Sequence, residues 1–208
     1  MGLINDHLGE PELEPMPGQT PAAPLMDLYI GVPESLADDI YGIHQILDQF
    51  LGPRHSNKYL WAPLRSGIRL GCLVRSGSLP DHLRDKARPV EPPLPGTEVA
   101  FNVQASPTFK SKIDSRPKPF DPDNRDGRLR WFQRRAKASG FEIIEVDLIR
   151  TTRLVQRKGE SFQLDDCEFF GRLVVRDEHK FFHALGSGIG KARTWGFGLL
   201  QLGKDGRS

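Results

Sequence analysis

The sequence predicts an α+β fold made of two tandem domains with similar topology. Each half of the chain reads as a strand, a helix, a pair of strands, a helix or turn, and a final strand. The halves are separated by ARPVEPPLPG (87–96), which carries four prolines in ten residues and is typical of a boundary between domains. A length of 208 residues accommodates two small domains of this kind.

The N-terminal domain is expected over residues 26–88, after an extended acidic arm. Residues 1–25 carry five prolines and no periodic pattern, which indicates little structure of their own. A helix is predicted over 35–51, because apolar residues recur there at helical spacing and Ser35 is a good N-cap. The other elements expected in this domain are strands over 26–32, 59–64 and 67–77 and a short helix or turn over 78–86.

The C-terminal domain is expected over residues 97–208, after a proline-rich linker over 89–96. A basic helix is predicted over 127–140, where glycines stand at both ends, and a long hairpin is predicted beyond it. The elements expected in chain order are a strand over 97–107, a polar loop over 110–127, that helix, strands over 141–157 and 161–177, a short helix over 177–188 and a strand over 194–202. Both halves therefore have the split βαβ order of a ferredoxin-like (RRM-like) domain.

Charge is concentrated in two regions of an otherwise ordinary composition. The hydrophobic fraction is 38% and the charged fraction is 27%, as in globular proteins generally. Residues 1–40 hold eight Asp and Glu and no Lys or Arg, whereas residues 110–158 hold fourteen Lys and Arg against seven Asp and Glu. Such a positive region indicates either a polyanionic partner or a solvated surface.

The composition gives no indication of a membrane, a disulfide framework or a metal site. No apolar run reaches the roughly 18 residues that a membrane span needs, and the acidic, proline-rich start lacks the apolar segment of a secretory signal. Two cysteines, Cys72 and Cys167, do not suffice for a disulfide framework or a zinc site. We therefore expect a cytoplasmic protein that uses no cofactor and no metal.

The stretch GSGIGKARTWGFGLL (186–200) holds five glycines within thirteen residues, and glycine-rich loops often approach phosphates closely. It does not match a mononucleotide-binding loop, because Ala192 follows Gly190-Lys191 where a Ser or Thr belongs. It does not match a dinucleotide fingerprint either, because Lys191 stands at the position of the last glycine. Two interpretations remain: backbone N–H groups that bind a nucleic acid backbone, or a turn that lets a helix and a strand pack closely.

Four segments in the expected order resemble the CasE endoribonucleases, which process CRISPR transcripts and belong to the RAMP superfamily. These segments are DIYGIHQILDQF (39–50), FNVQASPT (101–108), RWFQRRAKASGF (130–141) and GSGIGKARTWGFGLL (186–200). Together they are distributed along most of residues 26–202. The N-terminal arm and the compact first domain depart from the family pattern, which leaves a type I-E and a type IV complex as alternatives.

The resemblance implies metal-independent cleavage of a CRISPR repeat stem-loop by attack of the RNA's own 2′-hydroxyl. The products carry a 2′,3′-cyclic phosphate and a 5′-hydroxyl, and the protein stays on the 3′ hairpin as a subunit of an effector complex. The catalytic histidine and tyrosine of the family correspond to His44 and Tyr41, which lie three residues apart on one face of the predicted helix. His183 is the reserve candidate. The alternative function is an RNA-hairpin-binding subunit that does not cleave.

Basic residues and glycines of the C-terminal domain are the candidate RNA contacts. The predicted hairpin, the basic helix and the glycine-rich loop would face the stem, which is recognised mostly by shape and backbone. For many of these residues a solvated surface charge is the alternative. The set comprises Lys110, Lys112, Arg128, Arg134, Arg135, Arg150, Arg153, Arg157, Lys158, Gly186, Gly188, Gly190, Lys191 and Arg193.

Overall fold

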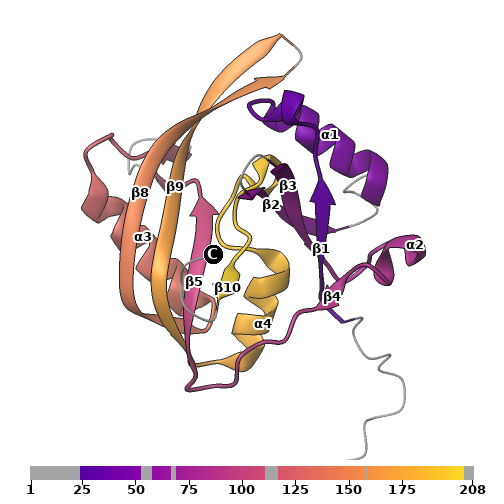
Figure 1. Cartoon of the computed structure of the whole chain (residues 1–208). Helices are drawn as coiled ribbons and strands as arrows, with labels where there is room; N and C mark the ends of the chain where they lie inside the picture. The colour runs from indigo at the N-terminus through magenta and orange to yellow at the C-terminus, as the bar shows by residue number, and fades with distance from the viewer. Residues whose placement is uncertain (1–23, 53–57, 67–68, 111–116, 158, 204–208) are drawn as a thin grey trace, which may run out of the picture.

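The computed structural model describes residues 24–52, 58–66, 69–110, 117–157 and 159–203 (Figure 1). The first half forms a four-stranded antiparallel sheet with strand order β2-β3-β1-β4. Its elements are β1 (Met26–Gly31), the 3₁₀ turn η1 (Glu34–Leu36), α1 (Ile40–Leu51), β2 (Tyr59–Ser66), β3 (Arg69–Ser76), α2 (Asp81–Arg84) and β4 (Arg88–Pro89).

The second half repeats this topology in a sheet with strand order β10-β5-β9-β8. Its elements are β5 (Glu98–Ala105), β6 (Thr108–Lys110), β7 (Pro117–Pro119), α3 (Arg125–Ala138), β8 (Phe141–Arg157), β9 (Glu160–Val175), α4 (Glu178–Ser187), η2 (Arg193–Trp195) and β10 (Gln201–Gly203). In the first sheet β1 lies between β3 and β4, and in the second β5 lies between β9 and β10. The first strand of each domain therefore has the central position of the ferredoxin-like arrangement. The predicted fold of two tandem ferredoxin-like domains is confirmed.

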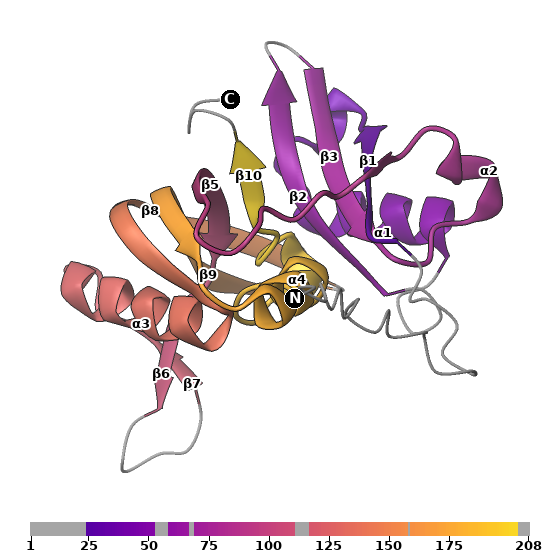
Figure 2. The same ribbon diagram turned by 90° about the horizontal axis from the view of Figure 1, so that it is seen from below.

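Local details differ from the sequence prediction at three places. The helix α1 begins at Ile40 rather than near Ser35, because Pro33 starts a 3₁₀ turn and Asp39 caps the helix by accepting the N–H of Gly42. The predicted last strand is reduced to β10, since glycines with positive φ at 196 and 198 hold the preceding chain out of extended geometry. The predicted polar loop over 110–127 is bordered by a small two-stranded ribbon, β6–β7, which projects beyond α3 in Figure 2.

Each domain has its own apolar core between its sheet and its helices. The buried face of α1 consists of Ile40, Ile43, Leu47 and Leu51, which recur at helical spacing and lie against the N-terminal sheet. In the C-terminal domain the rings of Phe101, Phe132 and Phe169 stack beneath α3. Burial of a side chain of this size contributes about 1.5–3 kcal/mol, so these faces fix both helices on their sheets.

The two domains exchange parts of their cores. Val155, near the tip of the β8–β9 hairpin, is fully buried in the core of the N-terminal domain, and Figure 1 shows the hairpin extending over α1. In the opposite direction, Leu25 precedes β1 yet belongs to the C-terminal core. The buried guanidinium of Arg75 pairs with Asp27 at 2.7 Å and donates across the domain boundary to the carbonyl of Leu200. These contacts fix the position of α1 relative to the C-terminal domain.

Candidate active site

Helix α1 carries His44 and Tyr41 at the edge of its buried stripe, on the side that faces the C-terminal domain. The spacing of three residues places both side chains on one face, as expected from the sequence. The His44 side chain is only 13% exposed, because the C-terminal domain covers this face of the helix. The site is therefore formed between the two domains rather than on the helix alone.

The glycine-rich loop meets this face through Trp195, which belongs to the 3₁₀ turn η2. The indole ring lies edge-on to the His44 imidazole, with 6.3 Å between ring centroids and 71° between planes. It also lies 6.2 Å from the ring of Tyr41 and 5.6 Å from that of Phe162 on β9. The structure thus brings the two predicted catalytic side chains and the glycine-rich loop together.

A carboxylate completes the surroundings of the imidazole. Asp48 is one helical turn after His44, and its Oδ2 lies 3.5 Å from His44 Nε2. The hydroxyl of Tyr59, on β2, donates a hydrogen bond of 2.6 Å to the other carboxylate oxygen of Asp48. The sequence analysis did not identify either residue. The i,i+4 spacing of His44 and Asp48 was the available signal for Asp48, whereas the contact of Tyr59 depends on the tertiary fold.

Arg153 connects the hairpin to the glycine-rich loop. Its guanidinium forms an ion pair of 2.7 Å with Asp166, donates to the carbonyl oxygen of Trp195 at 2.8 Å, and lies 4.3 Å from the centre of the Phe197 ring. Burial raises the pKa of the Asp166 carboxyl, and the charge of Arg153 opposes that rise. Arg153 was predicted to bind RNA, but its side chain is 13% exposed and is engaged within the protein.

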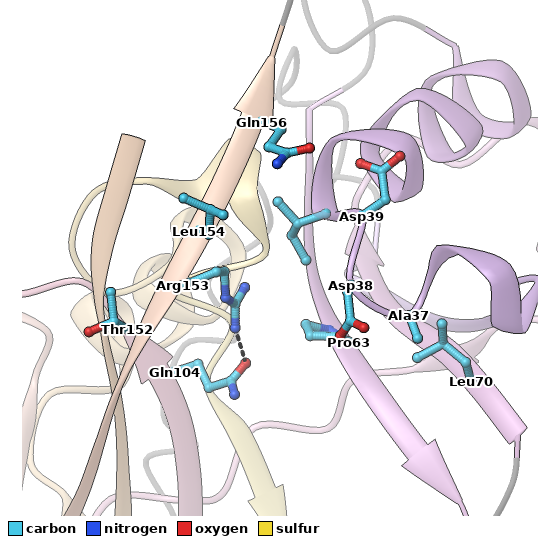
Figure 3. Close-up of a pocket in the computed structure, with 11 residues that line it drawn as sticks. Ala37, Asp38, Asp39, Pro63, Leu70, Gln104, Thr152, Arg153, Leu154 and Gln156 are labelled. Atoms are coloured by element: carbon cyan, nitrogen blue, oxygen red, sulfur yellow. Dashed lines mark hydrogen bonds between the residues drawn. The ribbon is translucent and has the colours of Figure 1, made fainter. Parts of the chain in front are cut away.

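A cleft of about 750 Å³ lies beside these contacts, between β8 and the start of α1 (Figure 3). Asp38 and Asp39 lie on the α1 side, and Thr152 and Gln156 lie on β8. The guanidinium of Arg153 donates a hydrogen bond of 3.2 Å to the side-chain oxygen of Gln104, and both residues also line the cleft. His44 and Tyr41 are not among the lining residues, so this cleft and the imidazole face are separate features.

The glycines of the loop mainly allow close packing. Gly188 has φ of 80° and donates its N–H to the carbonyl of Ala184, and a Cβ there would lie only 3.0 Å from Gly198 O and from Leu60. A Cβ at Gly190, where φ is 85°, would meet the Trp131 ring at 2.9 Å. The N–H of Ile189 is also taken, by the carbonyl of Gly198. The expected cradle of backbone N–H groups is therefore wrong at Gly188, and packing accounts for Gly190.

The prediction that Arg128 contacts RNA is also wrong. Its side chain is fully buried and forms a bidentate ion pair with Asp165, at 2.8 and 3.1 Å. The guanidinium also donates to main-chain carbonyls that precede α3 and begin it, those of Phe120, Asp121, Pro122 and Asn124. This residue fixes α3 to the long hairpin and is not available to a ligand.

The other predicted contacts lie on the surface or outside the described residues. The exposed members are Arg134, Arg135, Arg150, Arg157, Gly186, Lys191 and Arg193. Arg150 shares Asp165 with Arg128, at 2.8 Å, and Arg135 lies over the Trp131 ring. Lys112, Lys158 and the side chain of Lys110 lie outside the described residues. RNA binding by the exposed residues stays a prediction.

His183, the reserve candidate, is exposed on α4 and lies 3.3 Å from the hydroxyl of Ser187. It lines a second pocket, of about 610 Å³, together with Lys58 and Arg193. Across the described ranges, no three His, Cys, Asp or Glu side chains are grouped so that they could hold a metal ion. Within the same ranges, no helix is long and apolar enough to cross a membrane.

Fold and site together define a protein of two tandem ferredoxin-like domains, in which a histidine-bearing helix of the first domain faces a glycine-rich loop of the second. The chain belongs to the CRISPR-associated protein family, whose model matches residues 19–204. The resemblance to the CasE type is confirmed.

The relatives of this chain include solved proteins with the same fold. The CRISPR-associated endoribonuclease Cse3 of Thermus thermophilus is 28% identical over 129 residues, which are 55% of this chain and 60% of that protein. The match therefore spans less than two thirds of the relative's length. A structure of Thermus thermophilus Cse3 bound to an RNA representing a pre-cleavage complex superposes with a TM-score of 0.73 at 21% identity, and covers 86% of this chain and 99% of that one. Cas6e from Escherichia coli K-12 superposes with a TM-score of 0.65 at 21% identity, and covers 86% and 97%.

Proposed function

We propose that this protein is a metal-independent endoribonuclease that binds the stem-loop of CRISPR repeat RNA and cuts the precursor to mature guide RNA. The observation that carries the proposal is the meeting of His44 and Tyr41 with Trp195, in a loop that presents exposed Lys191 and Arg193. An imidazole and a phenol that face a loop with cationic side chains suit proton transfer at a phosphate. Kinship with an enzyme named as a CRISPR-associated endoribonuclease supports the same function.

The proposed reaction is an internal transfer at phosphorus. The 2′-oxygen attacks the adjacent phosphate, the bond between phosphorus and the 5′-oxygen breaks, and the products carry a 2′,3′-cyclic phosphate and a 5′-hydroxyl. One proton must leave the 2′-hydroxyl and one must reach the departing 5′-oxygen. His44 performs one of these transfers. Tyr41 orients the 2′-hydroxyl or donates to the charged phosphorane, and Lys191 and Arg193 hold the phosphate backbone.

The product would remain bound through its 3′ hairpin. The protein would then be a subunit of a CRISPR effector complex, as the solved relatives in an RNA-guided surveillance complex are. The relative in that complex is 21% identical to this chain, and at this identity the likeness shows only the fold. Contacts with other subunits are therefore part of the proposal.

The test is an incubation with a repeat hairpin RNA in EDTA, with mapping of the product ends. We expect cleavage with cyclic phosphate ends, and no cleavage when a 2′-deoxynucleotide precedes the cut. His44→Ala should slow cleavage by about 10²–10⁴-fold while the dissociation constant stays unchanged. The control His82→Ala removes an exposed imidazole on α2 and should cleave normally.

Tight binding without cleavage by the wild-type protein would contradict the enzyme proposal and favour a non-cleaving hairpin cap. Cleavage that stops in EDTA would instead contradict metal independence.

A further inference from the structure

The imidazole of His44 is contacted from two sides by residues with no assigned role. We propose that Asp48 and Trp195 are positioning residues, which fix the orientation of the His44 ring for proton transfer; the inference rests on the proposed function. Asp48 Oδ2 lies 3.5 Å from Nε2, and the Trp195 indole meets the ring edge-to-face. A carboxylate that faces one ring nitrogen favours one ring orientation and one tautomer.

Asp48 is itself held by a second element. The hydroxyl of Tyr59 donates to Asp48 Oδ1 at 2.6 Å, and Tyr59 is 3% exposed in the core beneath β2. One carboxylate oxygen is therefore anchored to the sheet while the other faces the imidazole. The anchor limits the rotamers that Asp48 can adopt, so its contact with His44 is more definite than that of an ordinary surface i,i+4 pair.

Trp195 is held from the C-terminal domain. Arg153 donates to its main-chain oxygen at 2.8 Å, and Phe162 packs against its indole from the hairpin. The same indole lies against Tyr41, so one side chain contacts both predicted catalytic residues. The position of the imidazole thus depends on α1, on β2 and on the docked loop together.

Correct placement of a catalytic group has a large effect on rate. A displacement of about 1 Å by a mutation outside the reacting atoms can cost about 100-fold. Asp48→Asn weakens the carboxylate contact and keeps the shape, and Trp195→Ala removes the ring surface. Each is expected to reduce the single-turnover cleavage rate about 100-fold and to leave the affinity for the repeat hairpin unchanged.

Conservative variants separate positioning from folding. Trp195→Phe keeps an aromatic ring beside His44 and should recover most of the rate. Tyr59→Phe removes only the hydroxyl that holds Asp48 and should reproduce part of the Asp48→Asn effect. The control Asp81→Asn removes a carboxylate that is 94% exposed and paired with Arg84, and should cleave at the wild-type rate.

A second readout needs no RNA. The C–H resonances of the His44 imidazole, identified in the free protein by their loss in His44→Gln, should carry a ring-current shift from the indole. That shift should disappear in Trp195→Ala.

The outcomes are distinguishable. Wild-type protein that does not cleave would overturn the proposed function. Full-rate cleavage by Asp48→Asn and Trp195→Ala, or equal losses of rate and affinity, would overturn the positioning role alone. An absent ring-current shift would also overturn it. If Trp195→Ala does not fold, Asp48→Asn and Tyr59→Phe still decide the matter, because both keep the local shape and both are expected to slow cleavage.

Discussion

At the scale of single residues, arginines with similar surroundings in the sequence have opposite roles. Arg128 and Arg134 lie on the same helix, yet the first is fully buried in an ion pair and the second is exposed. The sequence shows a basic helix and cannot show which cation faces Asp165, 37 residues further on. Tyr59 and Trp195 escaped prediction for the same reason, because their contacts join elements distant in the chain, whereas Asp48 was overlooked although it is four residues from His44 on the same helix.

The stability of the C-terminal domain should depend on Arg128. Arg128→Met leaves the buried Asp165 with Arg150 as its remaining ion-pair partner among the described residues, so we expect a loss of about 3 kcal/mol in the free energy of unfolding. Urea denaturation measures this loss. Arg134→Met, which removes an exposed arginine from the same helix, should change the free energy by less than about 0.5 kcal/mol. Equal effects of the two variants would contradict the assignment of Arg128 to the interior.

The exposed cations of the glycine-rich loop should act on RNA affinity instead. Lys191→Ala and Arg193→Ala should each weaken binding of the repeat hairpin and reduce the slope of log affinity against log salt by about 1. Binding titrations at several salt concentrations measure the slope. An unchanged slope would show that these side chains do not contact phosphates.

At the scale of elements, the hairpin β8–β9 is a structural bridge as well as a candidate RNA contact. Its length and position were predictable from two apolar-rich runs around KGE, and so were α3 and α4. Its docking on α1 was not predictable. An alternating strand pattern shows that one face of the strand is buried, but it does not show which domain covers that face. The start of α1 was mispredicted because Ser35 and Asp39 are both acceptable caps, and Pro33 decided between them.

The docking of the hairpin predicts a contrast between adjacent residues. Val155 is fully buried in the N-terminal core, whereas Leu154 is 49% exposed. Val155→Ala should lower the free energy of unfolding by roughly 2 kcal/mol, through lost apolar burial and the cavity left behind. Leu154→Ala, measured by the same urea titration, should have little effect. A larger effect at Leu154 would mean that the hairpin docks in another register.

Helix α4 should contribute a pH-dependent part of the stability. Two hydrogen bonds from Lys180 lower the pKa of the Asp177 carboxyl from its usual 3.8. The larger effect comes from the Lys180 side chain and the smaller from its backbone N–H. This stabilisation is present above that value and is lost as pH falls through the lower folded pKa. Asp177→Asn keeps the cap and removes the titration. The difference in urea midpoint between the two proteins should therefore shrink below about pH 4, and a difference independent of pH would contradict the assignment.

At the scale of the whole molecule, the domains should unfold as one unit. Arg75 joins Asp27 of its own sheet to the carbonyl of Leu200 in the other domain. Arg75→Met should cost about 3 kcal/mol and weaken the coupling between the domains. Calorimetry should give one cooperative transition for the wild type and a broader or split transition for the variant. An equally sharp variant transition would show that apolar contacts alone couple the domains.

The exchange of core residues has a consequence for how the chain matures on the ribosome. Synthesis proceeds from the N-terminus, and early domains usually fold before later ones appear. Here the core of the first domain lacks Val155 until the β8–β9 hairpin has been made, and the core that buries Leu25 forms only with the second domain. His44 can contact Trp195 only after η2 has been made. A nascent polypeptide that lacks η2 would therefore expose apolar residues of the N-terminal core and could not form the contacts around His44, so the order of synthesis sets when this face of α1 is completed.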